Sequence, residues 1–338
     1  MRPRNHAFDL LCGLCILRMI VLHVAGFCGW RGDYWVGKMM AWTFYFMAFF
    51  FFKAGYFNKT VSGDSKAYFL DRTKRLLVPY ISWALIGNIV WFGLMLINLP
   101  LFQSYLEKRL EWSHLWMHSR PWGNAPVWFL FSFYVVYLLM HFLGKVKGLS
   151  YIVLLGPFLS YWLSTIDNPL WMGLDNVFLA AAFFFLGHLW HLALDRLGSR
   201  WSMALSIVLI AAFIFVNKQW HGEYDLSLNK YIQNPWGAVC STVLALCGLS
   251  GVLLCLPLKR IPGLCYIGEH SMVYFVLHYV LLNAYSLIGQ LCHQSMRNHW
   301  NDFIFCLALI LVTCTWLVPY IERVPWLSGR WPKRPAHA

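Results

Sequence analysis

The stretch FDLLCGLCILRMIVLHVAG, residues 8–26, is apolar over almost the whole length that a helix needs to cross a bilayer. Three of its side chains, Asp9, Arg18 and His23, are nevertheless ionisable. An ionisable side chain in the hydrocarbon region is costly, so it normally faces a protein interior or a water-filled cavity and marks a functional path. This stretch therefore predicts a membrane-spanning helix with a functional inward side.

The composition of the rest of the chain agrees with a membrane protein. Of the 338 residues, 59% are hydrophobic and only 12% are charged, whereas soluble domains carry about 25% charged residues. Apolar runs such as TFYFMAFFFF do not alternate as the strands of a membrane barrel would. We therefore predict an all-α polytopic bundle of about ten transmembrane helices, near 9–29, 36–57, 77–99, 127–144, 150–166, 176–194, 202–217, 235–257, 270–289 and 303–321.

The distribution of positive charge predicts the orientation of the bundle. An even number of spans puts both termini on one side, and Arg2, Arg4 and the basic tail at about 322–338 make that side cytoplasmic. The net charge of +13 is then positive-inside bias, and no nucleic-acid-binding motif accompanies it. We expect one transmembrane domain over residues 1–338, in the cytoplasmic (inner) membrane.

The polar residues of the first span do not all share one face. On a helical wheel Asp9, Cys12 and His23 fall within about 60° of one another, while Arg18 points roughly 140° away from His23. A histidine bonded to a carbonyl of a neighbouring helix is one interpretation of His23. The second polar residue, Arg18, favours a polar cavity instead.

The segment IGEHSMVYFVLHY, residues 267–279, opens the ninth span with a polar stripe. Ser271, Tyr274 and His278 follow at spacings that share one helix face, and Glu269 lies at the helix start. A buried polar stripe is harder to explain by packing alone than a single histidine. We expect these residues to take part in the site.

Basic residues gather before the third span, in FLDRTKRLLVPY, residues 69–80. Arg72 and Arg75 would share a face of an α-helix, and guanidinium groups bind phosphates in a bidentate manner. Lys74 lies between them, and Lys53 lies near the cytoplasmic end of the second span. Two simpler interpretations compete with phosphate contacts. The cluster before the third span could be ordinary positive-inside charge, and the Lys53 side chain could extend its ammonium to the membrane interface, which is called snorkelling.

The segment NAPVWFLFSFY, residues 124–134, begins the fourth span. Asn124 is a candidate contact for a substrate hydroxyl. Trp128 fits an ordinary belt of aromatic residues at the membrane interface. His188 and His191 are too weak a pair for a metal site, and the H-E-x-x-H pattern is absent from the sequence. We expect no metal.

Taken in order, these segments resemble the acyltransferase 3 family of integral membrane acyltransferases. The resemblance runs through an FD-x-L-x-G block followed by a histidine, an F-F-x-x-G-Y block, a basic block ending in P-Y, a W-F-L block, a late serine–tyrosine–histidine block and the terminal IERVPW. These blocks comprise Phe8, Asp9, Leu11, Gly13 and His23; Phe51, Phe52, Gly55 and Tyr56; Arg72, Arg75, Leu76, Pro79 and Tyr80; Trp128, Phe129 and Leu130; Gly268, Ser271, Tyr274 and His278; and residues 321–326.

Two positions depart from the family pattern. Cys12 stands where the family has an arginine, and Ala54 stands where it has a serine. Arg18 could take over the role of the missing arginine, or the site could be organised differently. The departures also fit a changed donor or acceptor.

The resemblance implies transfer from a cytoplasmic acyl-CoA, usually acetyl-CoA, to a hydroxyl of a cell-envelope glycan or lipid-linked sugar. It implies His23 as general base or transient acyl carrier, with Asp9 in the same block, and His278 or Arg18 as stabiliser of the oxyanion. Donor contacts would then come from Arg72, Lys74, Arg75, Lys53 and Tyr56, and acceptor contacts from Asn124, Trp128, Ser271, Tyr274 and Glu269.

Two other functions remain open on the sequence alone. A transporter or flippase for an anionic or sugar substrate would line its path with the same intramembrane polar residues, although no inverted repeat is visible. A membrane-embedded binding or scaffold protein that has lost activity would fit the changes at Cys12 and Ala54.

Overall fold

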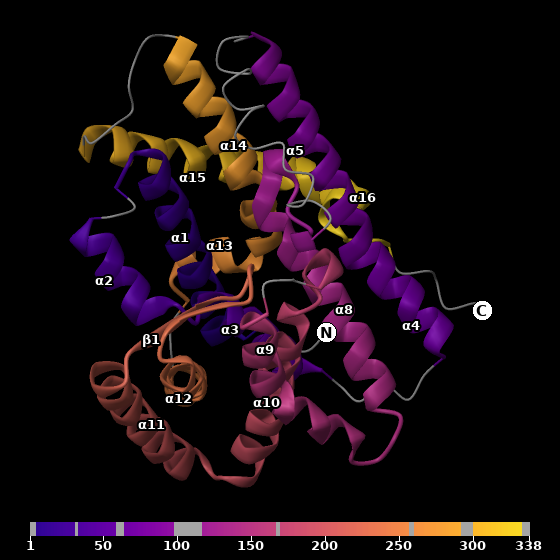
Figure 1. Cartoon of the computed structure of the whole chain (residues 1–338), viewed down its shortest axis with the longest axis vertical. Helices are drawn as coiled ribbons and strands as arrows, with labels where there is room; N and C mark the ends of the chain where they lie inside the picture. Colours follow the sequence, from indigo (N-terminus) through magenta and orange to yellow (C-terminus); the bar gives the residue numbers. More distant parts are fainter. Residues whose placement is uncertain are drawn as a thin grey trace. The chain divides into compact units, whose positions relative to one another are not determined.

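The computed structural model describes residues 5–30, 33–58, 64–97, 117–166, 170–256, 260–291 and 300–332, and it is a helix bundle (Figure 1). Its α-helices are α1 (His6–Phe27), α2 (Tyr34–Thr43), α3 (Phe46–Phe57), α4 (Ser65–Arg72), α5 (Val78–Ile97), α8 (Trp128–Leu143), α9 (Gly156–Ser164), α10 (Asn176–Arg196), α11 (Ser199–Gln219), α12 (Pro235–Cys255), α13 (Pro262–Glu269), α14 (Ser271–Leu291), α15 (Trp300–Glu322) and α16 (Pro325–Ser328). A π-helical turn, η1 (Thr73–Leu77), joins α4 to α5, and 3-10 turns occupy η2 (Trp122–Val127), η3 (Leu149–Leu155) and η4 (Trp171–Gly173).

Within the described residues, eight helical segments are long and apolar enough to cross a membrane. They correspond to eight of the ten expected spans. The expected span near 150–166 is the shorter apolar helix Leu149–Ser164, and the one near 270–289 is helical as α14. Large apolar side chains are exposed on these helices, as on α5, where Ile89 is 69% exposed. The chain is a multi-pass integral membrane protein of the all-α class.

One element was not expected. A short antiparallel hairpin, β1 (Gly222–Asp225) and β2 (Lys230–Gln233), follows α11, with Gly222 opposite Gln233. The buried Tyr224 on β1 reaches α12, where its hydroxyl lies 3.2 Å from that of Thr242. Four-residue strands are too short to leave a strong alternating pattern in the sequence.

The chain folds into two compact units that interleave along the sequence. Unit 1 comprises Met1–Leu22, Arg31–Val61 and Leu139–Ser271, and unit 2 comprises His23–Trp30, Ser62–Leu138 and Met272–Ala338. Helix α1 therefore contributes its first part to unit 1 and its last turn to unit 2.

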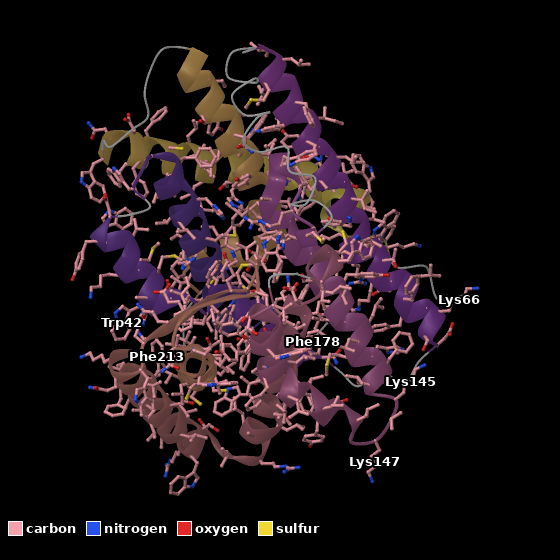
Figure 2. The ribbon with its side chains drawn as sticks, viewed as in Figure 1. Trp42, Lys66, Lys145, Lys147, Phe178 and Phe213 are labelled. Atoms are coloured by element: carbon pink, nitrogen blue, oxygen red, sulfur yellow. The ribbon has the colours of Figure 1, made fainter. Side chains whose placement is uncertain are left out.

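Unit 1 is held together by glycines that let backbones touch. A Cβ on Gly55 of α3 would lie 1.6 Å from the carbonyl oxygen of Phe184, and one on Gly187 of α10 would lie 1.9 Å from that of Phe52. Small residues permit such close approach between membrane helices. Aromatic contacts fill the remaining space, as between Trp42 and Phe213, whose ring centroids lie 5.9 Å apart (Figure 2).

Unit 2 uses the same device around η2. A Cβ on Gly123 would lie 1.9 Å from the carbonyl oxygen of Gly87 on α5. The backbone N–H of Gly123 donates to the Asn88 side chain at 3.0 Å, and the Asn283 side chain of α14 donates to the Gly123 carbonyl at 3.0 Å. The irregular backbone of η2 is thus satisfied by side chains from two helices, as membrane depth requires.

Candidate active site

Unit 2 brings together the two intramembrane histidines. The rings of His23, in the last turn of α1, and His278, on α14, have centroids 5.2 Å apart. His278 is fully buried and His23 is half-buried. The Tyr279 ring meets the His23 ring edge-on at 5.4 Å. Histidines from opposite ends of the chain therefore form one pair.

The hydrogen bonds of His278 determine which of its nitrogens carries the proton. Its Nδ1 lies 2.8 Å from the carbonyl oxygen of Phe275 and 3.1 Å from that of Tyr274. A carbonyl oxygen only accepts, so Nδ1 must be the N–H donor in the neutral ring. Nε2 then carries the lone pair, and it is buried with no hydrogen-bond partner among the described residues. His278 presents a proton acceptor inside the bundle.

The residues of the predicted polar stripe on α14 fall in different compact units. Tyr274 is fully buried, and its hydroxyl lies 2.6 Å from the hydroxyl of Thr315 on α15. Tyr274 therefore joins two helices of unit 2, while its backbone carbonyl serves His278. Ser271 is the first residue of α14 and belongs to unit 1.

A small cavity lies next along the same two helices. Its lining includes Phe27, which follows His23 by one helical turn on α1, and Leu282, which follows His278 by one turn on α14. Cys28, Ser286 and Cys306 complete the lining. The histidine pair thus lies one turn away from a small pocket in unit 2.

Asn124 is held at a break in the backbone of η2. Its φ of −152° and ψ of 60° are not helical, and its side chain is fully buried. The side-chain amide donates to the Val276 carbonyl on α14 at 2.9 Å, while Oδ1 has no partner among the described residues. Trp128 is only 5% exposed, so the interpretation as a lipid-facing belt residue is wrong.

The predicted basic cluster lies on and beside the π-helical turn, and its arginines differ. The Arg72 guanidinium lies over the Tyr137 ring at 4.1 Å and the Tyr68 ring at 4.9 Å. Arg75 is half-exposed, with Nε donating to the Asp71 carboxylate at 2.8 Å. Arg72 is held between aromatic rings, whereas Arg75 faces outward beside an exposed carboxylate. Arg75 is therefore the more available of the two for a phosphate.

In unit 1 one departure from the family pattern, Cys12, is contacted by a lysine of a neighbouring helix. Lys53 of α3 donates from Nζ to the Sγ of Cys12 on α1 at 2.9 Å. Cys12 is fully buried. The Lys53 ammonium is therefore held against a buried side chain of the first helix. This places a cation of α3 beside Cys12, a contact with no sequence signal because the two residues lie on separate helices.

Arg18 is also in unit 1 and is buried. Its Nε donates to the Thr43 hydroxyl at 3.0 Å, its Nη2 lies 2.8 Å from the Met40 sulfur, and its guanidinium lies 3.9 Å from the centroid of the Phe46 ring. These contacts tie the first span to α2 and α3. Tyr56, also on α3, packs between the rings of Phe8 and His191 at 4.9 and 4.8 Å.

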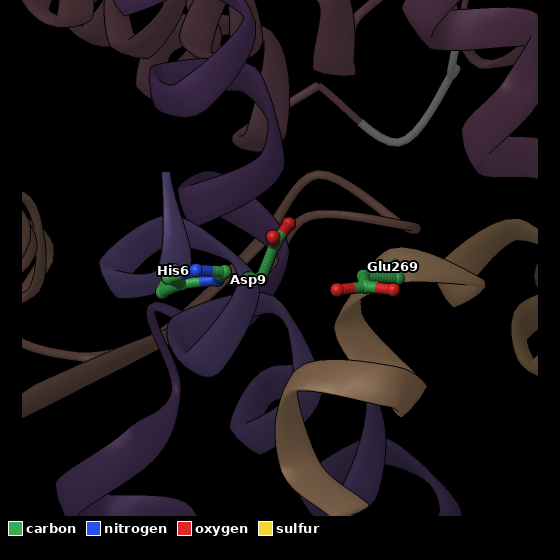
Figure 3. Close-up of side chains that lie close together, drawn as sticks. All are labelled: His6, Asp9 and Glu269. Carbon is green, nitrogen blue, oxygen red and sulfur yellow. The ribbon is translucent and has the colours of Figure 1, made fainter. Parts of the chain in front are cut away.

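Asp9 and Glu269 meet at the junction of α1 and α13 (Figure 3). With His6 they form a group whose polar atoms all lie within 4.8 Å of one another. Glu269 also accepts from Arg260 at 3.0 Å. The junction is tight, since a Cβ on Gly268 would lie 1.8 Å from the Asp9 carbonyl oxygen. Close backbone approach, rather than attraction between the two carboxylates, thus joins α1 to α13 here.

Comparison with known proteins agrees with this architecture. The Acyl_transf_3 family model, described as an acyltransferase domain, matches residues 5–320. The comparisons with curated proteins and with solved structures found no match. The family match therefore rests on the sequence of nearly the whole chain, across both compact units.

Proposed function

The chain belongs to the acyltransferase 3 family and is a membrane-embedded acyltransferase, and from that premise we propose that it transfers an acyl group, most simply acetyl, from cytoplasmic acyl-CoA to a hydroxyl of a cell-envelope glycan or lipid-linked sugar. The cytoplasmic (inner) membrane is the proposed location. The observation that carries the proposal is the pair of His23 and His278 in unit 2.

The reaction needs a base for the acceptor hydroxyl. The hydroxyl oxygen attacks the thioester carbonyl, its proton passes to His23, the carbon–sulfur bond breaks, and the CoA sulfur leaves as the thiol with the proton that His23 had accepted. His23 is the half-buried member of the pair and is therefore the one that can reach a substrate. General base catalysis of this kind contributes about 10²–10⁴-fold to the rate. The alternative is a transient acyl-His23: the imidazole nitrogen attacks the thioester and CoA leaves as the thiol with the imidazole proton. The acceptor hydroxyl then takes the acyl group and returns its proton to His23.

His278 supports the base rather than the oxyanion. Because Nδ1 is committed to backbone carbonyls, only Nε2 is available, and in the neutral ring it accepts but does not donate. An oxyanion needs a donor. We assign His278 as a proton acceptor beside His23.

The donor's phosphates would bind the basic turn. Arg75 offers a guanidinium that is half-exposed, and Lys74 lies on the same turn. Arg72 would contribute positive charge from its place between two tyrosine rings. Guanidinium groups recognise phosphates with paired hydrogen bonds.

The test measures acetyl-CoA binding and acetyl transfer to a bacterial envelope glycolipid extract by the purified, detergent-solubilised protein. We expect His23→Ala to bind acetyl-CoA normally and to lose transfer by about 10²-fold or more. Arg75→Gln should bind acetyl-CoA about tenfold more weakly, as expected for losing a charge-assisted hydrogen bond.

The matched control is His188→Ala, which removes a half-buried histidine of α10 that stacks on Phe185. It should bind and transfer like the wild type. Full transfer by His23→Ala would contradict its catalytic role. A folded wild-type protein that does not bind acetyl-CoA would remove the donor proposal, and transport of a sugar or anion would become the leading alternative.

A further inference from the structure

The basic turn has an unusual backbone, and Pro79 accounts for it. Proline has no N–H, and in an α-helix its ring collides with the carbonyl four residues earlier, which here is Arg75. The helix widens instead into the π-helical turn Thr73–Leu77, in which the N–H of Val78 donates to the carbonyl of Thr73. In a π-helix each carbonyl accepts from the N–H five residues later, so the Lys74 carbonyl would need the N–H of residue 79. Pro79 cannot supply it.

The other end of the chain supplies the missing donor. The indole N–H of Trp331 donates to the Lys74 carbonyl at 2.9 Å, and the Lys74 ammonium lies 5.5 Å from the centroid of the Trp331 ring. Gly329, with a φ of +68°, passes so close to the next carbonyl that a Cβ added to it would lie 2.4 Å from the oxygen of Arg75. The same C-terminal segment therefore covers the backbone of both Lys74 and Arg75.

The segment Pro325–Trp331, which we call the C-terminal clasp, is itself anchored. The indole N–H of Trp83, one turn after Pro79 on α5, donates to the Leu327 carbonyl at 2.9 Å. Arg330 pairs with Glu322 at the end of α15. Helix α16 contacts both α5 and the π-helical turn. The clasp is thus part of unit 2 and is built against the turn on several sides.

We propose that the C-terminal clasp sets the geometry of the donor-phosphate site, with Trp331 as its positioning residue. This inference rests on the proposed function. The side chains of Lys74 and Arg75 branch from the backbone that the clasp holds. If the clasp were loosened, the ammonium and the guanidinium would no longer be held in fixed positions relative to each other. Trp331 touches no reacting atom in this scheme; it acts through the turn.

The experiment compares Trp331→Phe, which keeps an aromatic ring for Lys74 but removes the indole N–H, with wild type. Dissociation constants are measured for acetyl-CoA and for acetyl-pantetheine, a thioester donor without phosphates, together with KM and kcat. We expect acetyl-CoA to bind about three- to tenfold more weakly, the effect of one lost hydrogen bond. Binding of acetyl-pantetheine and kcat should not change.

Trp326→Phe is the matched control, because Trp326 lies in the same clasp and is 47% exposed. It should behave as wild type. Unchanged acetyl-CoA affinity in Trp331→Phe, or equal weakening of both donors, would overturn the inference. If wild type binds neither donor, the proposed function itself fails and the clasp proposal falls with it.

A second variant tests the physical link. Pro79→Ala restores a backbone N–H at residue 79, so the Lys74 carbonyl no longer depends on Trp331. In that background Trp331→Phe should weaken acetyl-CoA binding much less than it does in wild type, which is the coupling that a double-mutant cycle measures. An equal loss in both backgrounds would show that Trp331 does not act through this carbonyl.

Discussion

At the scale of single residues, the polar side chains that look alike in the sequence have different surroundings. His278 is fully buried with its proton committed to the backbone, whereas His23 is half-buried beside it. Arg72 is enclosed by tyrosine rings, whereas Arg75 is half-exposed. Neighbouring side chains, more than residue type, thus decide which group can meet a substrate.

The contact between Lys53 and Cys12 leads to a prediction at this scale. We expect Lys53→Ala to lower acetyl transfer by at least about tenfold, because one intramembrane cation is lost without replacement. The double variant Cys12→Arg with Lys53→Ala moves the cation back to α1 and should recover part of that loss. Transfer is measured from acetyl-CoA to the glycolipid extract.

Lys38→Ala serves as the control, since Lys38 is an exposed cation on α2 whose ammonium lies over the Tyr34 ring. It should leave transfer unchanged. If the double variant is no more active than Lys53→Ala alone, Lys53 does not substitute for a cation on the first span.

At the scale of elements, glycines determine how closely helices approach. Helix α13 lies against α1 so closely that a Cβ on Gly13 would be 2.0 Å from the Leu264 carbonyl oxygen. The same close approach joins α3 to α10 in unit 1 and α5 to η2 in unit 2. Without a hydrophobic driving force in lipid, close packing of this kind is a main source of helix association.

Gly268→Ala tests this packing. The added Cβ would lie 1.8 Å from the Asp9 carbonyl oxygen, so the helices must separate, and we expect a loss of about 1–3 kcal/mol or more. The measurement is the thermal unfolding midpoint in detergent. Gly263→Ala, in the same helix with nothing within 4 Å of its added Cβ, should leave the midpoint nearly unchanged. Equal midpoints for the two variants would show that α13 does not depend on this contact.

At the scale of the whole molecule, the family model covers a chain that folds as two interleaved compact units. Each unit takes helices from widely separated parts of the sequence, and α1 contributes residues to both. Deleting an internal stretch would therefore remove helices from one unit while interrupting the chain path of the other. The orientation of the bundle in the membrane stays a prediction from the positive charges.

Cysteine labelling tests that orientation. The exposed residues Lys147, in the loop after α8 (Figure 2), and Lys230, on β2, are expected on the cytoplasmic and outer sides. A membrane-impermeant maleimide should label Lys230→Cys in intact cells and Lys147→Cys only after permeabilisation. Labelling of the unsubstituted chain measures the background from the native cysteines, of which Cys240 is exposed. The reverse pattern would invert the predicted topology.

The sequence by itself determined the class of the protein, the positions of most spans, the histidines and the basic cluster. These features are local, because each membrane helix satisfies its own backbone and must be apolar along its own length. Only the tertiary structure decided that His23 meets His278, that Lys53 reaches Cys12, and that the Lys74 carbonyl is bonded by Trp331, 257 residues away. Such contacts depend on how separate helices pack, which side-chain spacing within one helix does not encode.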